Sequence, residues 1–102
     1  MPMLHTVNKS PFEKDSLDAC IAHALDGSAV ILIEDGVYAA SSGTAVEPRV
    51  RDAMQRLNFF ALANDCKARG LAEAELIDGI ELVDYGGFVD LVTGHDGVQS
   101  WL

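Results

Sequence analysis

The sequence predicts an α/β fold, a three-layer α/β/α sandwich around a mostly parallel sheet of four or five strands. Short aliphatic and β-branched runs alternate along the chain with stretches of helical period, which is typical of parallel strands joined by helices. One run, residues 28–35 (SAVILIED), is apolar without alternation, which indicates a strand that is covered on both faces. At 102 residues the chain, 1–102, is expected to form one domain.

The first strand is expected at residues 3–7, and the first helix follows it. Ser10 and Glu13 have the spacing of a capping box with Pro11 at the first helical position, which predicts that the helix begins there. The helix is expected to end at Asp26, before Gly27. Its apolar positions recur at helical spacing and form one stripe: Leu17, Cys20, Ile21, Ala24 and Leu25.

The later elements follow the same alternation. Gly70 is a common helix-ending residue, and it closes the short turn that begins at Cys66. A fifth short strand is expected near residues 75–77. The other expected elements are a loop or single helical turn at 37–45, a helix at 46–57, strands at 58–65 and 79–85, and a last helix after residue 86 with Phe88, Leu91 and Val92 facing inward.

Polar residues follow several of the predicted strands. Ligands and partners of parallel sheets meet the carboxyl ends of the strands. The same residue types form turns, so a binding site and ordinary strand-to-helix turns both remain open. The segments concerned are Asn8-Lys9-Ser10, Glu34-Asp35-Gly36, Asn64-Asp65 and Asp84-Tyr85-Gly86-Gly87.

The charge excludes autonomous nucleic-acid binding, because a net charge of −9 repels a phosphate backbone. All seven basic residues lie at or before Arg69, so the acidic residues beyond it form either a solvated face or a docking surface for a basic partner. No apolar run is long enough to span a bilayer, and the first ten residues lack the features of a signal peptide. The protein is therefore expected in the cytoplasm, with both cysteines as free thiols.

Several chemistries have no motif to support them. The sequence lacks G-x-G-x-x-G, a P-loop and G-x-S-x-G, and its first strand does not end in the acidic residues of a receiver domain. Cys20 and His23 lie three apart and could supply half of a metal site, but no second pair has ligand spacing. No cofactor and no metal are expected.

Cys20 is the candidate catalytic residue, and its interpretation stays open. Its place on the apolar stripe favours core packing, and it lies beyond the first helical turn, where the helix dipole lowers a thiol pKa only weakly. A reactive thiolate at Cys20 would need a cation nearby, and the candidates are Lys9, Lys14 and His23. Cys66 follows a predicted strand end, but the adjacent Asp65 disfavours a thiolate.

Four segments and the terminal QSWL, in order along nearly the whole chain, resemble the DsrH/TusB family. The segments are LHTVNKSP, EDGVYAA, ALANDCKARGL and VDYGGFVDLV. Each is weak alone, and their collinear order is specific. The length and the KSPF and EDGVYAA forms look closer to the DsrH branch than to the TusB branch.

The resemblance implies a small subunit of a sulfurtransferase complex without a self-sufficient active site. Such a heterohexamer holds two copies each of DsrE/TusD-like, DsrF/TusC-like and DsrH/TusB-like chains, and it passes persulfide sulfur to a DsrC/TusE-type acceptor. In the DsrH branch the sulfur enters sulfur oxidation, whereas in the TusB branch it becomes the 2-thio group of tRNA wobble uridine. The principal thiol lies on the DsrE/TusD-like chain, while Cys20 matches a helix cysteine typical of DsrH members. Trp101-Leu102 is a candidate anchor for a neighbouring subunit.

Overall fold

The centre of the molecule is a sheet of five parallel strands. The computed structural model describes residues 3–102. The strands lie in the order β4-β3-β2-β1-β5, and every neighbouring pair is parallel. Their bounds are β1 Leu4–Val7, β2 Ala29–Leu32, β3 Asn58–Leu62, β4 Glu81–Val83 and β5 Val98–Trp101.

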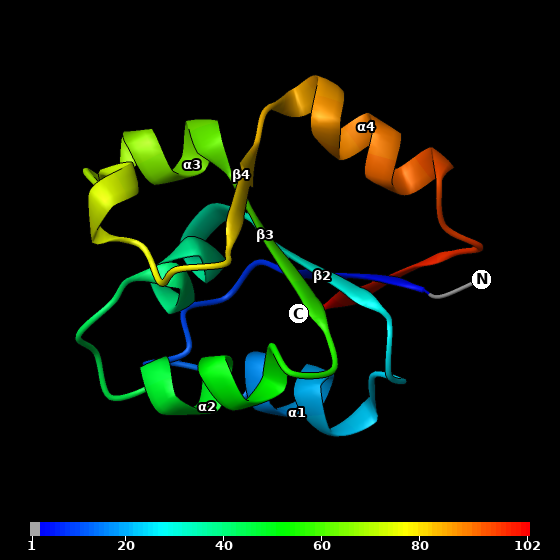
Figure 1. Ribbon diagram of the computed structural model, residues 1–102, viewed down its shortest axis with the longest axis horizontal. Helices are drawn as coiled ribbons and strands as arrows, with labels where there is room; N and C mark the ends of the chain where they lie inside the picture. The colour runs from blue at the N-terminus through cyan, green and yellow to red at the C-terminus, as the bar shows by residue number, and fades with distance from the viewer. Residues whose placement is uncertain (1–2) are drawn as a thin grey trace.

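Helices lie on both faces of the sheet, so the predicted three-layer α/β arrangement is confirmed (Figure 1). Helices α1 (Ser16–His23) and α2 (Glu47–Ala53) lie side by side on one face, and α4 (Tyr85–Thr93) lies on the other. Helix α3 (Ala63–Ala68) follows β3 directly. Two 3-10 helices complete the described chain, η1 at Glu34–Ala40 and η2 at Glu73–Glu75.

The two faces bury very different amounts of apolar surface. On the α1/α2 face one large cluster combines residues of β1, β2 and β3 with α1, α2, α3 and η1. On the α4 face the cluster of buried residues is small, Leu4, Ala29 and Ile31, and it packs against the half-buried Phe88 and Leu91 of α4. Strand β2 contributes alternate side chains to both clusters and is buried throughout, as its unbroken apolar run predicted.

Several predicted element boundaries are wrong, among them the end of the first helix, which is His23, and the bounds of β3 (Asn58–Leu62) and β4 (Glu81–Val83). Helix α1 begins at Ser16 rather than near Pro11, because the carbonyl of Ser10 accepts hydrogen bonds from the amides of Glu13 and Lys14, both at 3.1 Å, and closes a separate turn. The strand expected over 28–35 ends at Leu32, since Glu34 has a φ of 49° that turns the chain out of the sheet and into η1.

The fifth strand lies elsewhere than expected. It is β5, next to β1, whereas residues 75–77 form only a single antiparallel bridge between Ser41 and Leu76. The expected inward position of Val92 is also wrong, because its side chain is 38% exposed. Between residues 3 and 102, no helix is both long and apolar enough to cross a membrane.

Candidate functional site

Polar residues at the carboxyl ends of β1, β2 and β3 meet as the topology predicted, and we call Asn8, Glu34, Asp35, Asp65 and Arg69 the strand-end cluster. The Nδ2 of Asn8 donates to Glu34 Oε2 at 3.2 Å, and the backbone amide of Glu34 donates to Asp65 Oδ2 at 2.7 Å. Arg69 Nε donates to Asp35 Oδ1 at 2.9 Å, and this bond raises the pKa of the guanidinium further. One cation, Arg69, thus pairs with two of the three carboxylates, Asp35 and Asp65.

The backbone at this edge is tightly constrained by Gly36. A Cβ atom at Gly36 would lie 2.1 Å from the carbonyl oxygen of Val7, far inside van der Waals contact. The chain therefore passes directly over the end of β1, and only glycine fits there. The turn from β2 into η1 therefore requires glycine at position 36, while Glu34 and Asp35 supply polar groups.

The strand-end cluster contains no thiol and no hydroxyl side chain. Its nearest thiol in sequence, Cys66 on α3, is 2% exposed. Burial and the neighbouring Asp65 raise the pKa of Cys66, and Arg69 offsets this only in part. The side chains of the cluster mainly bind one another, which favours the turn-forming interpretation over a reaction centre. One polar atom, Asn8 Oδ1, is buried with no hydrogen-bond partner in the described part of the chain.

Cys20 lies on the inner face of α1 and is fully buried in the larger apolar cluster. Burial raises the pKa of its thiol to about 12, against a smaller lowering effect of Arg56. At neutral pH the sulfur is therefore a protonated thiol with no access to solvent. The predicted place of Cys20 on the apolar stripe is confirmed, whereas Leu25, expected on the same stripe, follows the helix and is 77% exposed. The catalytic role of Cys20 stays a prediction.

The cation that acts on Cys20 is not one of those expected. Arg56 follows α2 and donates through its guanidinium to the carbonyls of Ala24, at 2.7 Å, and Ile21. These bonds satisfy carbonyls at the end of α1 and fix Arg56 beside the Cys20 helix. His23 instead donates from Nδ1 to the Ala19 carbonyl at 2.8 Å. The sequence reasoning missed Arg56 because the contact joins residues 35 positions apart.

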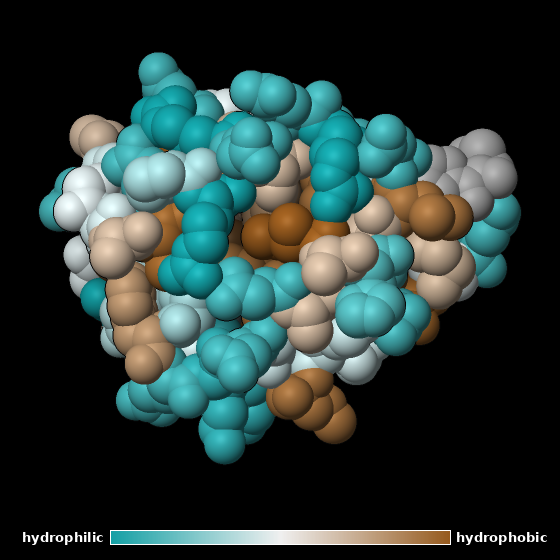
Figure 2. Space-filling view, turned by 90° about the horizontal axis from the view of Figure 1, so that it is seen from below, coloured by the Kyte–Doolittle hydropathy of each residue, from teal (hydrophilic) through white to brown (hydrophobic). Residues whose placement is uncertain are grey.

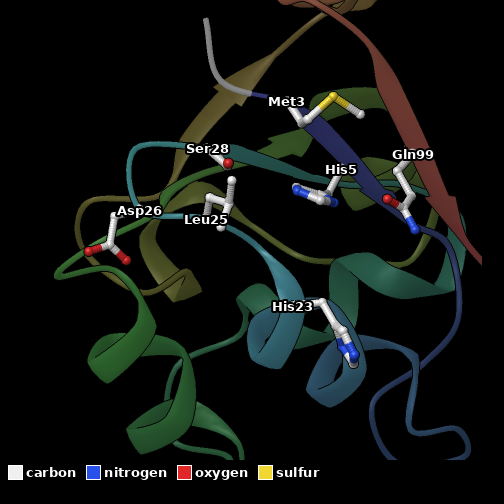
Figure 3. A pocket seen from close by; sticks show the side chains of 7 residues that line it. All are labelled: Met3, His5, His23, Leu25, Asp26, Ser28 and Gln99. Carbon is white, nitrogen blue, oxygen red and sulfur yellow. The ribbon is translucent and has the colours of Figure 1, made fainter.

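A cavity of about 500 Å³ lies at the opposite edge of the sheet, beside the amino ends of β1 and β2 (Figure 3). Its lining combines two imidazoles with small polar groups and apolar side chains from β1, β5 and the end of α1. The lining residues are Met3, His5, His23, Leu25, Asp26, Ser28 and Gln99.

His5 and Trp101 define the inner wall next to this cavity. Trp101 Nε1 donates to His5 Nδ1 at 3.0 Å, so His5 is a neutral imidazole with its proton on Nε2. Burial also lowers the pKa of His5. The Trp101 ring lies 5.7 Å from the His23 ring, which joins β5 to α1. Sequence reasoning missed this pairing because residues 98–101 were not recognised as a strand.

The predicted half-site for a metal gains no further ligands. Cys20 is buried in the core, whereas the His23 ring packs on Trp101. Within residues 3–102, no three side chains of His, Cys, Asp or Glu come together in a way that would hold a metal ion.

Comparison with known proteins agrees with the fold. The crystal structure of the ychN protein from E. coli superposes with a TM-score of 0.83 at 18% identity, covering 98% of each chain. A protein of unknown function, MTH1491 from Methanobacterium thermoautotrophicum, superposes with a TM-score of 0.77 at 17% identity, covering 95% of this chain and 96% of that one. These similarities show the fold alone.

Sequence comparison identifies the family. A family model described as "DsrH like protein" matches residues 9–98. The protein named TusB from Pectobacterium parmentieri is 34% identical over 99 residues, which cover 97% of this chain and all of the relative. The protein named TusB from Escherichia coli strain K12 is also 34% identical over the same coverage. The chain therefore belongs to the DsrH/TusB family.

Proposed function

We propose that this chain is a non-autonomous subunit of a cytoplasmic sulfur-relay complex, in which the sulfur-carrying thiol lies on another subunit. Membership of the DsrH/TusB family over nearly the full length carries the proposal. The burial of both thiols supports it, because persulfide transfer requires a thiolate that can reach its partner. The role of the chain is then mainly architectural, in shaping the site where the acceptor meets the complex.

The TusB branch is the better proposal for the end use of the sulfur. The sequence segments resembled the DsrH branch more closely, yet the curated relatives at 34–35% identity carry the name TusB. We therefore place the chain with TusD-like and TusC-like subunits in a 2:2:2 complex that serves a TusE-like acceptor and 2-thiolation of tRNA wobble uridine. Sulfur oxidation through DsrE-like and DsrF-like partners and a DsrC-like acceptor is the alternative.

The test is co-expression of this chain with the TusC-type and TusD-type subunits from its own genome. Light scattering after gel filtration should show one complex near six subunits. Introduced into a bacterium that lacks its own TusB, the same set should restore 2-thiouridine in bulk tRNA, measured by mass spectrometry of nucleosides. A monomer that ignores both partners would refute the proposal, and assembly without restored thiolation would favour sulfur oxidation.

Autonomous sulfur transfer through Cys20 is the competing function, and it would need the core to open. Incubation of the isolated chain with a persulfide donor, followed by intact-mass analysis, separates the two. We expect no added sulfur on the native wild type. An increase of one sulfur that Cys20→Ser abolishes would assign Cys20 a transfer step.

A further inference from the structure

Helix α4 carries more apolar surface than the sheet covers. Phe88 and Leu91 pack against the sheet. Tyr85, Val89 and Val92 lie at i, i+4 and i+7 and are 56%, 58% and 38% exposed. At 3.6 residues per turn, these five positions form one apolar arc about 160° wide, of which the sheet covers only the inner part.

Strand β5 carries a further exposed apolar residue on the same face of the sheet. Val98 is the register partner of Leu4, whose side chain packs on the α4 face, and Val98 is 43% exposed. We call Tyr85, Val89, Val92 and Val98 the α4 surface. The opposite face contrasts with it, because hydrophilic side chains largely cover the α1/α2 side and leave apolar atoms visible only in hollows and isolated spots (Figure 2).

Every charged residue next to the α4 surface in the sequence is acidic. Glu81 is exposed and lies on the α4 face, because it is two residues from Val83, which packs there. Asp84, the residue before Tyr85, is exposed at the start of α4, and no Lys or Arg occurs after Arg69. Asp90 is also exposed, but at about 100° per residue it lies on the side of α4 opposite the apolar arc. Two copies of the chain meeting through this surface would bring like charges together around an apolar centre, which disfavours self-association there.

We propose that the α4 surface is a docking site for a different protein, one that presents an apolar patch bordered by Lys and Arg. An apolar centre with a charged rim is the usual construction of a protein interface, and the acidic rim selects a basic partner. The proposal rests on the proposed function, in which this chain assembles with two other subunits. It adds the face of the chain that makes the contact and the charge of the partner surface.

The test compares two aspartate substitutions at equally exposed apolar positions. Val89→Asp puts a charge in the centre of the α4 surface, whereas Phe12→Asp does so on the turn before α1, where Phe12 is 56% exposed. Both side chains lie outside the core, so circular dichroism and the melting temperature should stay close to wild type. Binding to the immobilised TusC-type and TusD-type subunits, separately and together, is measured for all three proteins.

We expect Val89→Asp to weaken binding at least tenfold and Phe12→Asp to leave it within twofold of wild type. Exchange of hydrogen for deuterium in the wild-type complex should slow at residues 85–93. Unchanged binding of a folded Val89→Asp protein would overturn the proposal while leaving the proposed function intact. Failure of the wild type to bind either subunit would refute the proposed function itself.

The charge of the partner is tested by Glu81→Lys. We expect a several-fold loss of affinity, and a loss of wild-type affinity as salt concentration rises, since both follow from a basic partner rim. Tighter binding of Glu81→Lys would overturn the basic-partner assignment. A wild-type homodimer that Val89→Asp converts to monomer would overturn it as well, because the occupant would then be a second copy.

Discussion

Substitution of Cys20 separates its packing role from any chemical role. Cys20→Ala removes one buried heavy atom, comparable to Ile→Val, so the free energy of unfolding should fall by about 1 kcal/mol. Cys20→Ser keeps the size but buries a hydroxyl in an apolar cluster, which should cost about 1–3 kcal/mol. If Cys20 is a packing residue, Ser is therefore the worse replacement, although it is the closer chemical mimic of a thiol.

The assay combines urea unfolding with thiol labelling in a Cys66→Ala background, so that Cys20 is the single thiol. With a pKa of about 12, only about one Cys20 in 10⁴ is a thiolate at pH 8, and the sulfur is also inaccessible. Labelling by a bulky maleimide should therefore proceed only through unfolding. Native-state labelling as fast as in urea, or loss of sulfur transfer in a complex assembled with Cys20→Ala, would refute the packing assignment.

Three further predictions concern the strand-end cluster and His5. Gly36→Ala would force a Cβ atom onto the carbonyl oxygen of Val7, so it should lower the free energy of unfolding by about 3 kcal/mol or abolish folding. The urea midpoint measures this, and a midpoint equal to that of wild type would contradict the close approach. Arg69→Met leaves Asp35 and Asp65 without their cation, so it should cost roughly 1 kcal/mol and make melting temperature rise with added salt more than in wild type. Burial lowers the pKa of His5 below 6.5, so below about pH 6.5 the unfolded chain binds a proton that the folded chain does not. The free energy of unfolding is therefore highest above about pH 6.5, and it falls as the pH drops towards the pKa of His5 in the folded chain. His5→Gln should reduce the drop in urea midpoint between about pH 7.5 and 5.5, and an equal drop in both proteins would contradict it.

The buried strands were predictable from the sequence because burial leaves a local signal. Residues 29–32 are apolar at every position, and apolar clusters cover both faces of the sheet there. Strand β5 was not predictable in the same way, since Gln99 and Ser100 are exposed and polar, and only pairing with β1 holds the segment extended. The start of α1 was misplaced because Ser10 makes the hydrogen bonds of a turn that resembles a helix N-terminus in sequence.

The candidate site was likewise predictable from the sequence only in part. The meeting of Asn8, Glu34 and Asp65 follows from the rule that parallel strands end at one edge, and the structure confirms it. The environment of Cys20 depended on a contact between elements far apart in the sequence, which no local pattern encodes. Its position on the stripe gave the correct burial, whereas the identity of the nearby cation, Arg56, required the tertiary arrangement.

The pairing of β1 with β5 has a consequence for how the fold is completed. Contacts such as that of His5 with Trp101 join residues 96 positions apart, and closing so long a loop is entropically costly before the intervening strands have formed. We therefore expect β5 to join the sheet late in refolding. Trp101 is the single tryptophan of the sequence and packs near two imidazoles, so its fluorescence reports this step. In a stopped-flow experiment the emission change should lag behind the far-ultraviolet circular dichroism, which makes the sheet edge observable in time without any introduced label.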